Sequence, residues 1–538
     1  MDMAPVAAGP SRSEGIAPGA KAAIEKPAGR AWWLPSLTEV VFVAVLLWLL
    51  VGGNGAQALL ADGDTGWHIR TGEYILAERR FPTTDLYSFS RLGAEWFAWE
   101  WGSDVVFALA HRLAGLPGVV LLGGMAIAAT SAALFRFLLW QGVNVLVAVV
   151  GTLVAAAAST MHWLARPHLF TSLAFLVSLW LLEADRRQPT PWVWGLAALA
   201  TLWANLHGGF VILPAVLLCY CLESGIEARR SKGNRDWQEV RRRGLFLLVA
   251  TASTFVNPYT YRLHLHIWRY LRSDFIRNRV PEFAAPSFRG ESMLAFELLL
   301  LAGLLVVPWL WKRREYFPAL LIIGLAYAAL DSARHVPLYV IAATPAVAGA
   351  ASKALGSLQG GIGGAIASLA ADYAPRIEGG GGTWIPLWAA GAVVLSAALL
   401  CSGGQRWRAD FPREKFPQAA LAAAEMKLVG HRVFTSDQWG DYLIYRFYPR
   451  TRVFIDGRSD FYGPEIGQQY LDAVVASHRW EEIFNHHGFE AALLPAEWPL
   501  ATVLKAHPGW RLEYDDGQAL VLRRVGSRSP ISAKQANP

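Results

Sequence analysis

Eleven stretches of this sequence are apolar over lengths that suit a membrane-spanning helix. They lie at residues 37–58, 118–140, 143–160, 168–183, 192–206, 209–223, 244–256, 294–310, 317–330, 336–352 and 384–401. A helix rises about 1.5 Å per residue, so the first stretch can cross a hydrocarbon core of about 30 Å. The chain is 54% hydrophobic and only 17% charged, which is typical of a membrane protein with some soluble mass attached. The sequence therefore predicts a polytopic α-helical membrane protein with about eleven spans.

The Lys and Arg residues indicate how these spans are oriented. Basic clusters at 186–187, 229–232, 241–243 and 312–314 all fall on one side of the membrane when the spans are counted in order. Cytoplasmic loops carry an excess of Lys and Arg, so this side is predicted to be cytoplasmic. Residues 1–36 have no apolar periodicity and are predicted to form a disordered cytoplasmic tail. An odd number of spans then places the C-terminus outside.

Three regions between the spans stand out within the predicted transmembrane domain, 37–404. The first external loop, 59–117, contains amphipathic segments at 74–80 and 105–113 that suit helices lying along the membrane surface. The second external loop, 257–293, is rich in Tyr, His and Arg, and 355–382 is a Gly-rich cytoplasmic linker. The three cysteines lie in apolar segments and give no disulfide framework.

From about residue 405 the composition changes to that of a soluble domain. Helices are expected at 419–429 and 466–476, and strands at 432–434, 452–456, 491–494 and 519–522. Alternating strands and helices of this length predict a small external α/β domain at 405–525. The last residues, 526–538, are predicted to form a second disordered tail.

Polar residues gather at the span ends and turns of the predicted outer side. The densest group, Asp62-Gly-Asp64-Thr-Gly-Trp67-His68, directly follows the first span. Turns on the cytoplasmic side carry mainly the basic residues that set the orientation. Scattered polar residues would not sort in this way, because loops on both sides contact water. We therefore expect one cavity that opens to the outer face and is lined by Asp62, Asp64, His68, Glu100, His162, Arg166, His168, Asn205, His207, Asn257, Tyr259, Glu282, Asp331, Arg334 and His335.

Each residue type suggests a role in such a cavity. Asp64, or else Asp62, can act as general base for an incoming hydroxyl or amine. Arg166 and Arg334 can pair with a lipid phosphate, which suits guanidinium geometry. The histidines can hydrogen-bond a leaving phosphate or sugar hydroxyls. The predicted substrate-binding set in the membrane domain is Trp67, His68, Glu100, Arg166, His168, Asn205, His207, Asn257, Glu282, Arg334 and His335.

Several of these residues also have a purely structural interpretation. Asp64 can cap a helix that begins there. Arg166-Pro-His168 can anchor a span at the membrane interface, and Asn205-Leu-His207 can satisfy the backbone of broken helix ends. In the C-terminal domain, the Asp456-Gly-Arg458 turn either stabilises the fold or contacts an acceptor sugar from above the cavity.

The thirteen histidines do not form a recognisable metal site. No pair has the spacing that places two imidazoles and an acid on one helix face. No cofactor is therefore predicted with certainty, although a divalent cation near the acids stays possible as an expectation. Phosphate-binding loops, nucleophile elbows and basic-aromatic arrays are also missing from the sequence, so nucleic acid is not an expected partner.

The chain resembles the GT-C glycosyltransferases, a superfamily that includes protein O-mannosyltransferases, the aminoarabinose transferase of lipid A and lipopolysaccharide-core transferases. The resemblance covers about 37–525, and it is greatest to uncharacterised bacterial members. Their shared motifs are Asp-x-x-Trp-His, Arg-Pro-His, Asn-x-His and Asp-Gly-Arg. Here they read Asp64-Thr-Gly-Trp67-His68, Arg166-Pro-His168, Asn205-Leu-His207 and Asp456-Gly-Arg458.

The resemblance implies an inverting sugar transfer from a polyprenyl-phosphate donor to a lipid, polysaccharide or protein acceptor. The reaction would take place at the outer face of the bacterial inner membrane, with Asp64 or Asp62 as base. Many members have adjacent Asp and Glu in the first loop, whereas Gly63 separates the two acids here. Two other functions stay open: a transporter or flippase, and an inactive GT-C-fold scaffold of the cell envelope. A transporter would be expected to carry charged groups near the membrane midplane and often an internal repeat.

Overall fold

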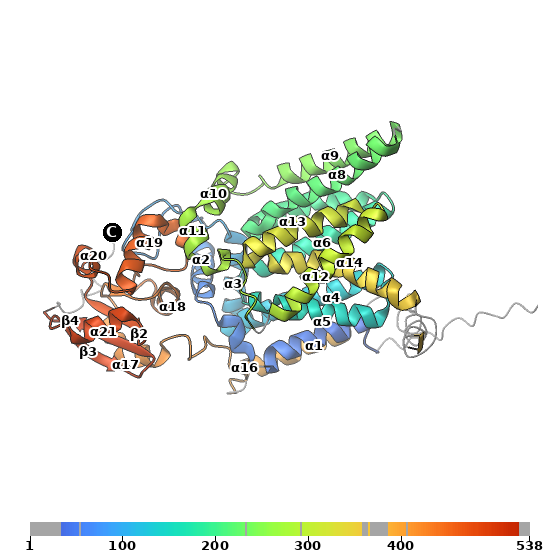
Figure 1. Ribbon diagram of the computed structural model, residues 1–538. Coiled ribbons are helices and arrows are strands. Elements are labelled where there is room, and N and C mark those ends of the chain that lie inside the picture. The colour runs from blue at the N-terminus through green and yellow to red at the C-terminus, as the bar shows by residue number, and fades with distance from the viewer. Residues whose placement is uncertain are drawn as a thin grey trace, which may run out of the picture.

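The computed structural model describes residues 34–52, 55–231, 234–290, 293–357, 364–365, 386–404 and 407–526. The predicted tails at 1–36 and 526–538 and the Gly-rich linker lie almost entirely outside these ranges. A bundle of long helices makes up one part of the molecule, and a smaller mixed domain makes up the other (Figure 1). Segment 59–117 lies between the two.

Each of the eleven predicted apolar stretches coincides with a helix. These helices are α1 (Leu37–Val51), α4 (Leu116–Trp140), α5 (Val145–Ser159), α6 (His168–Arg187), α7 (Gly195–Leu206), α8 (Ile212–Ser231), α9 (Asn234–Ser253), α12 (Met293–Lys312), α13 (Tyr316–Asp331), α14 (Val336–Ser357) and α16 (Leu387–Cys401). Six helical segments among the described residues are long and apolar enough to cross a membrane, and α1, α13 and α16 are shorter apolar helices. The chain is therefore a multi-pass helical protein, whereas the number of eleven spans stays a prediction.

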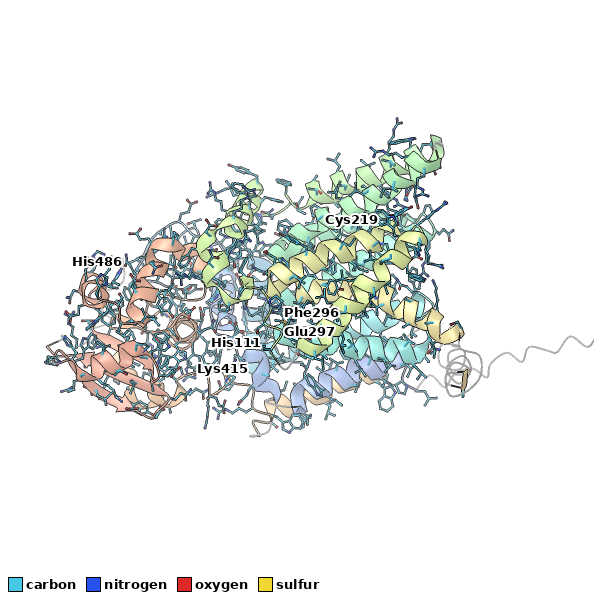
Figure 2. All side chains as sticks on the ribbon, viewed as in Figure 1. His111, Cys219, Phe296, Glu297, Lys415 and His486 are labelled. Atoms are coloured by element: carbon cyan, nitrogen blue, oxygen red, sulfur yellow. The ribbon has the colours of Figure 1, made fainter. Side chains whose placement is uncertain are left out.

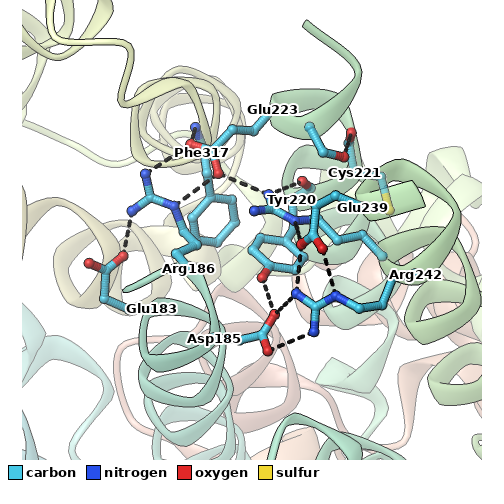
Figure 3. A network of polar contacts seen from close by, with 11 residues as sticks. Glu183, Asp185, Arg186, Tyr220, Cys221, Glu223, Glu239, Arg242 and Phe317 are labelled. Carbon is cyan, nitrogen blue, oxygen red and sulfur yellow. Dashed lines mark hydrogen bonds and ion pairs between the residues drawn. The ribbon is translucent and has the colours of Figure 1, made fainter. Parts of the chain in front are cut away.

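A network of buried charges joins the helices at the end of the bundle that carries the basic clusters (Figure 3). Asp185 on α6 accepts hydrogen bonds from Tyr220 on α8 and from both amino groups of Arg242 on α9. Glu223 on α8 binds the guanidinium of Arg186 on α6 at 2.9 Å. Each buried charge thus has a counter-charge, as the low polarity of a membrane interior requires.

The C-terminal domain contains a four-stranded sheet in the order β1-β2-β4-β3. Strand β1 (Val433–Phe434) is parallel to β2 (Ala491–Pro495), and β4 (Ala519–Arg524) is antiparallel to β2 and to β3 (Trp510–Asp515). The helices of the domain are α17 (Gln418–Leu428), α18 (Asp437–Phe447), α19 (Ser459–Val474), α20 (Trp480–His487) and α21 (Pro499–Ala506). The segment 452–456, which was expected to be a strand, forms only isolated β-bridges through Val453 and no continuous strand.

Segment 59–117 is built into this domain instead of lying free beside it. Val453 bridges Val433 of β1 on one side and Ser88 on the other, so residues from this segment extend the sheet edge. Helix α2 (Asp64–Glu78) packs against α3 (Trp101–Ala114) and against α18. Most of the first three turns of α2 are buried. The helix expected at 74–80 is the last part of α2, and its position along a membrane surface stays a prediction.

Candidate functional site

A cavity of about 220 Å³ lies where the helix bundle, α2 and the C-terminal domain meet. Its walls come from α2, from the turns before α6 and α8, from α10 (Tyr261–Arg272), and from the short helices Pro281–Phe283 and Ala333–His335. The C-terminal domain contributes the turn at 457–460. Twelve candidate residues from the sequence line this cavity: Asp64, Trp67, His68, Glu100, His162, Arg166, His168, His207, Glu282, Arg334, His335 and Arg458.

Arg166 is the centre of a cluster of three carboxylates on one side of the cavity. Its guanidinium lies 3.1 Å from Asp62 Oδ2 and 2.5 Å from Asp64 Oδ2, and it also pairs with Glu282. Backbone contacts hold Arg166 in place: the Thr65 hydroxyl donates to the Ala165 carbonyl at 3.0 Å. Arg166 keeps the pKa of Glu282 well below its usual range. The cluster joins three segments that are distant in sequence.

The two acids of the first loop have different positions. Asp62 Oδ1 accepts the backbone N–H of Asp64 at 2.9 Å, which forms a turn around Gly63, the N-cap residue of α2. Asp64 is the acid that lines the cavity. Gly63 between them accounts for the split acid pair, because a Cβ there would lie 2.4 Å from the carbonyl oxygen of Gln438 on α18. The close approach of α18 therefore requires glycine at this position.

Asp64 holds one oxygen against Arg166 and the other, Oδ1, without a hydrogen-bond partner among the described residues. Oδ1 points at Gly457, where an added Cβ would lie only 1.9 Å away. Burial raises the pKa of Asp64 to about 7, Arg166 opposes this increase, and Asp62 adds to it. A carboxylate with this pKa can accept a proton near neutral pH.

Arg334 is the cation of the cavity that has no carboxylate within ion-pair distance among the described residues. Its Nη1 is buried and has no hydrogen-bond partner there. The guanidinium stacks on the ring of Phe283 at 4.4 Å. The Ala333 N–H donates to the Ala284 carbonyl, which fixes the helical turn that carries Arg334 next to the one that carries Glu282. Arg334 is therefore held in position with its charge available.

The histidines of the cavity are held by specific partners. His68 Nδ1 lies 2.6 Å from Asp104 Oδ1, and its Nε2 lies 3.7 Å from Glu100 Oε2. His207 Nε2 lies 3.4 Å from Glu100 Oε1. By contrast, His168 and His335 contact the backbone carbonyls of His162 and Ala328. Glu100 thus lies between two imidazoles.

Asp456 and Arg458 form a buried structural clamp. The Arg458 guanidinium binds Asp456 at 2.6 Å and Asp85 of segment 59–117 at 2.8 Å. The Tyr462 hydroxyl donates to Asp456 at 2.7 Å. Arg458 also lines the cavity, whereas Asp456 does not. This geometry supports the structural interpretation of the Asp-Gly-Arg turn, and it joins the C-terminal domain to the first loop.

Asn205 and Asn257 lie outside the cavity. Asn205 accepts a hydrogen bond from the Trp101 indole at 2.8 Å and donates to the carbonyls of Thr201 and Val256. Asn257 donates to the Thr254 carbonyl and accepts from the Tyr259 N–H, which is the pattern of a turn. Both amides are engaged with the chain itself, and their binding of substrate stays an untested prediction.

The three carboxylates of the cluster surround a cation of the protein itself. Asp62, Asp64 and Glu282 converge on the guanidinium of Arg166, which is already the counter-charge at their centre. Within the described ranges, no group of three or more His, Cys, Asp or Glu is placed to hold a metal ion. Cys219 lies in the helix bundle and His486 in the C-terminal domain, far from each other (Figure 2).

Two buried acids near the cavity were not among the predicted site residues. Asp104 at the start of α3 contacts His68. Asp441 on α18 accepts the N–H of Gly457 at 3.0 Å, and burial together with the nearby Asp64 raises its pKa. Asp104 follows Trp101-Gly-Ser in an amphipathic segment, where it is indistinguishable in sequence from an ordinary acidic residue of a first helical turn.

Comparisons with known proteins identify the fold. No protein-family model matches the chain, and no curated protein matches it. It is similar to a crystal structure of the Archaeoglobus fulgidus oligosaccharyltransferase tethered with an acceptor peptide that contains the NVT sequon. The TM-score is 0.55 and the sequence identity is 12%, and the comparison covers 91% of this chain and 74% of that chain. A structure of the same enzyme in complex with an inhibitory peptide and a dolichol-phosphate is also similar, with a TM-score of 0.53 and 11% identity. That comparison covers 92% of this chain and 74% of the other. This chain therefore shares the overall fold of the Archaeoglobus fulgidus oligosaccharyltransferase.

Proposed function

We propose that this protein is an integral membrane glycosyltransferase that takes its sugar from a polyprenyl-phosphate donor. The observation that carries the proposal is the cavity itself. It combines a carboxylate with one unpartnered oxygen, Asp64, and a half-buried guanidinium, Arg334, whose buried Nη1 has no hydrogen-bond partner and which pairs with no carboxylate among the described residues. These are the groups that a transfer from a phosphate leaving group to a hydroxyl or amine acceptor requires.

Arg334 binds the phosphate of the donor in this proposal. Arg166 already shares its charge among three carboxylates, so it holds Asp64 in place instead. The cavity wall beside Arg334 is apolar and includes Val211, Ile212, Ile267, Leu271 and Leu338. A charged headgroup site next to an apolar wall suits a phosphate that is attached to an isoprenoid chain.

Asp64 is the general base. Its Oδ1 removes the proton from the acceptor O–H or N–H, and the acceptor atom forms a bond to the anomeric carbon. The bond from that carbon to the phosphate oxygen breaks on the opposite face, and the lipid phosphate leaves with the electron pair. Arg334 stabilises its charge. The configuration at the anomeric carbon inverts in this single displacement.

The fold comparison supports the same substrate classes. One of the similar structures holds a dolichol-phosphate, and another holds a tethered acceptor peptide. We infer that the cavity of this chain faces the outer side of the bacterial inner membrane, with the N-terminus cytoplasmic and the C-terminal domain periplasmic. The acceptor is an envelope lipid, polysaccharide or protein.

The test is transfer of labelled sugar from polyprenyl-phosphate donors by the purified protein in detergent. Asp64→Asn should lower kcat by about 10²- to 10⁴-fold, because it removes the base and keeps the shape. Asp62→Asn is the matched control: it keeps an oxygen that accepts the Asp64 N–H and should lose less activity. Equal losses in both variants would contradict the assignment of Asp64, and binding of donor without turnover by the unchanged protein would contradict the proposed function.

A further inference from the structure

A row of buried polar side chains extends from the cavity wall into the protein and makes no ion pair with Arg166 among the described residues. Its members come from α2, α3, α6, α7 and the turn before α8. His68, Glu100, Asp104 and His207 are all at most 9% exposed. No Lys or Arg forms an ion pair with either acid among the described residues. The net charge of this buried row therefore depends on how the two carboxyl groups and the two imidazoles share their protons.

The hydrogen bonds at one end fix the proton of His207. The Trp203 indole donates to the Thr171 oxygen at 2.8 Å, and Thr171 lies 2.7 Å from His207 Nδ1. The Gly209 N–H also donates to Nδ1, at 2.9 Å. Because Nδ1 accepts, the proton of the neutral ring is on Nε2, which faces Glu100 Oε1 at 3.4 Å.

The other end allows two arrangements with the same number of protons. In the first, His68 donates Nδ1–H to Asp104, and Glu100 is protonated and directed at His68 Nε2. In the second, Asp104 is protonated and donates to Nδ1, while His68 carries its proton on Nε2, 3.7 Å from an ionised Glu100. In both, Asp104 and Glu100 hold one proton between them. Burial raises the pKa of each acid, that of Glu100 to about 8.

We propose that Asp104, His68 and Glu100 form a unit in which two carboxyl groups share one proton through the imidazole, and that Glu100 delivers this proton to the departing phosphate. The delivery step rests on the proposed function. As the bond between the anomeric carbon and the phosphate oxygen breaks, that oxygen takes the proton of Glu100, while Asp64 takes the proton of the acceptor. Exchange with water then returns one proton to the unit and removes one from Asp64.

The positions of the three residues suit these roles. Glu100 and His68 line the cavity, whereas Asp104 does not and is fully buried. Asp104 is therefore a positioning residue that orients His68 and holds the proton when Glu100 is ionised. The charged and titratable groups that act on the unit from neighbouring elements are Arg166, His168, His207, Arg334 and Asp460.

Infrared spectroscopy of the full-length protein in detergent tests the unit without any activity. The carboxylic C=O band of Glu100 is identified as the band that Glu100→Gln removes at neutral pH, and it is then titrated. Asp104→Asn should move its midpoint to lower pH by about one unit or more, because the second negative charge is gone. Glu78→Gln, on the exposed end of α2, is the control and should change neither the band nor the midpoint.

In the same preparations, Glu100→Gln should lower kcat at least tenfold with donor binding unchanged. A spectrum in which Glu100→Gln removes no band, or a midpoint that Asp104→Asn leaves in place, would overturn the shared proton. Loss of the band with wild-type kcat would overturn the delivery step. If the unchanged protein transfers no sugar at all, the proposed function fails, and the infrared titration alone decides whether the two acids share a proton.

Discussion

The two oxygens of Asp64 have different surroundings, and this difference suits a base. Oδ2 is held by Arg166, and Oδ1 has no hydrogen-bond partner among the described residues and faces Gly457. Asp62 is the same residue type, but one of its oxygens accepts the Asp64 N–H and the other faces Arg166. Which of the two acids lines the cavity depends on the residue at which α2 starts. A pattern of residue types does not determine that starting residue.

The pH dependence of transfer follows from the two cavity acids. Asp64, with a pKa of about 7, must be ionised, so activity should fall as the pH decreases through 7. Glu100, with a pKa of about 8, must be protonated, so activity should fall as the pH increases through 8. A profile of kcat/KM against pH should be bell-shaped between these values. A flat profile from pH 6 to 9 would contradict both assignments.

Replacement of Arg334 should act on the donor. Arg334→Gln removes the one positive charge of the cavity that no described carboxylate neutralises, and the KM for the lipid-linked donor should rise by about tenfold or more. Arg334→Lys should recover only part of this loss, because an ammonium cannot form two parallel hydrogen bonds to phosphate. The matched control is Arg289→Gln, a change at an exposed position outside the cavity. An unchanged KM in Arg334→Gln would place the phosphate elsewhere.

At the scale of elements, the positions of the helices in the sequence were predictable. The elements against which each helix packs were not. The apolar stretches identify helices because a span must satisfy its own backbone hydrogen bonds. Segment 74–80 was expected at the membrane surface because its apolar face has helical period. In the structure this segment is the end of α2, and α2 packs against α3 and α18 mainly through the residues before it. Periodicity shows that a face is buried, but it does not show against what.

The contact of α2 with α3 depends on Gly72. A Cβ at this position would lie 1.9 Å from the carbonyl oxygen of Asp104 on α3. Gly72→Ala should therefore separate the two helices and destabilise the protein by about 1–3 kcal/mol. The expected result is a lower midpoint of thermal unfolding in detergent, with weaker transfer activity. Gly195→Ala, where no atom lies within 4 Å of the added Cβ, is the control. Equal midpoints for the two variants would contradict this account of the contact.

At the scale of the whole molecule, the site forms only when the C-terminal domain docks on the first loop. The Arg458–Asp85 pair joins residues 373 positions apart, and Val453 bridges Ser88 at the sheet edge. The motif Asp-Gly-Arg was visible in sequence, but its partner was not, because Asp85 lies in an unremarkable loop. Sequence patterns are local, whereas this cavity is built by contacts between distant segments.

Breaking the clamp should separate the domain from the loop. Arg458→Ala leaves Asp85 and Asp456 buried without their counter-charge, which costs about 3–5 kcal/mol. Backbone amides of 84–95 should then exchange hydrogen for deuterium faster, and transfer activity should fall with them. Arg511→Ala, an exposed change in the same domain, should leave the exchange unchanged. Unaltered protection of 84–95 in Arg458→Ala would show that the clamp does not hold the two parts together.

The most direct measurement is a cryo-electron microscopy structure of the Asp64→Asn variant with an intact polyprenyl-phosphate sugar. Our account predicts the phosphate within hydrogen-bond distance of Arg334, the anomeric carbon next to position 64, and the isoprenoid chain along Ile267, Leu271 and Leu338. A donor bound anywhere else on the protein, with the cavity free of sugar and phosphate, would contradict the assignment of this cavity as the site of glycosyl transfer.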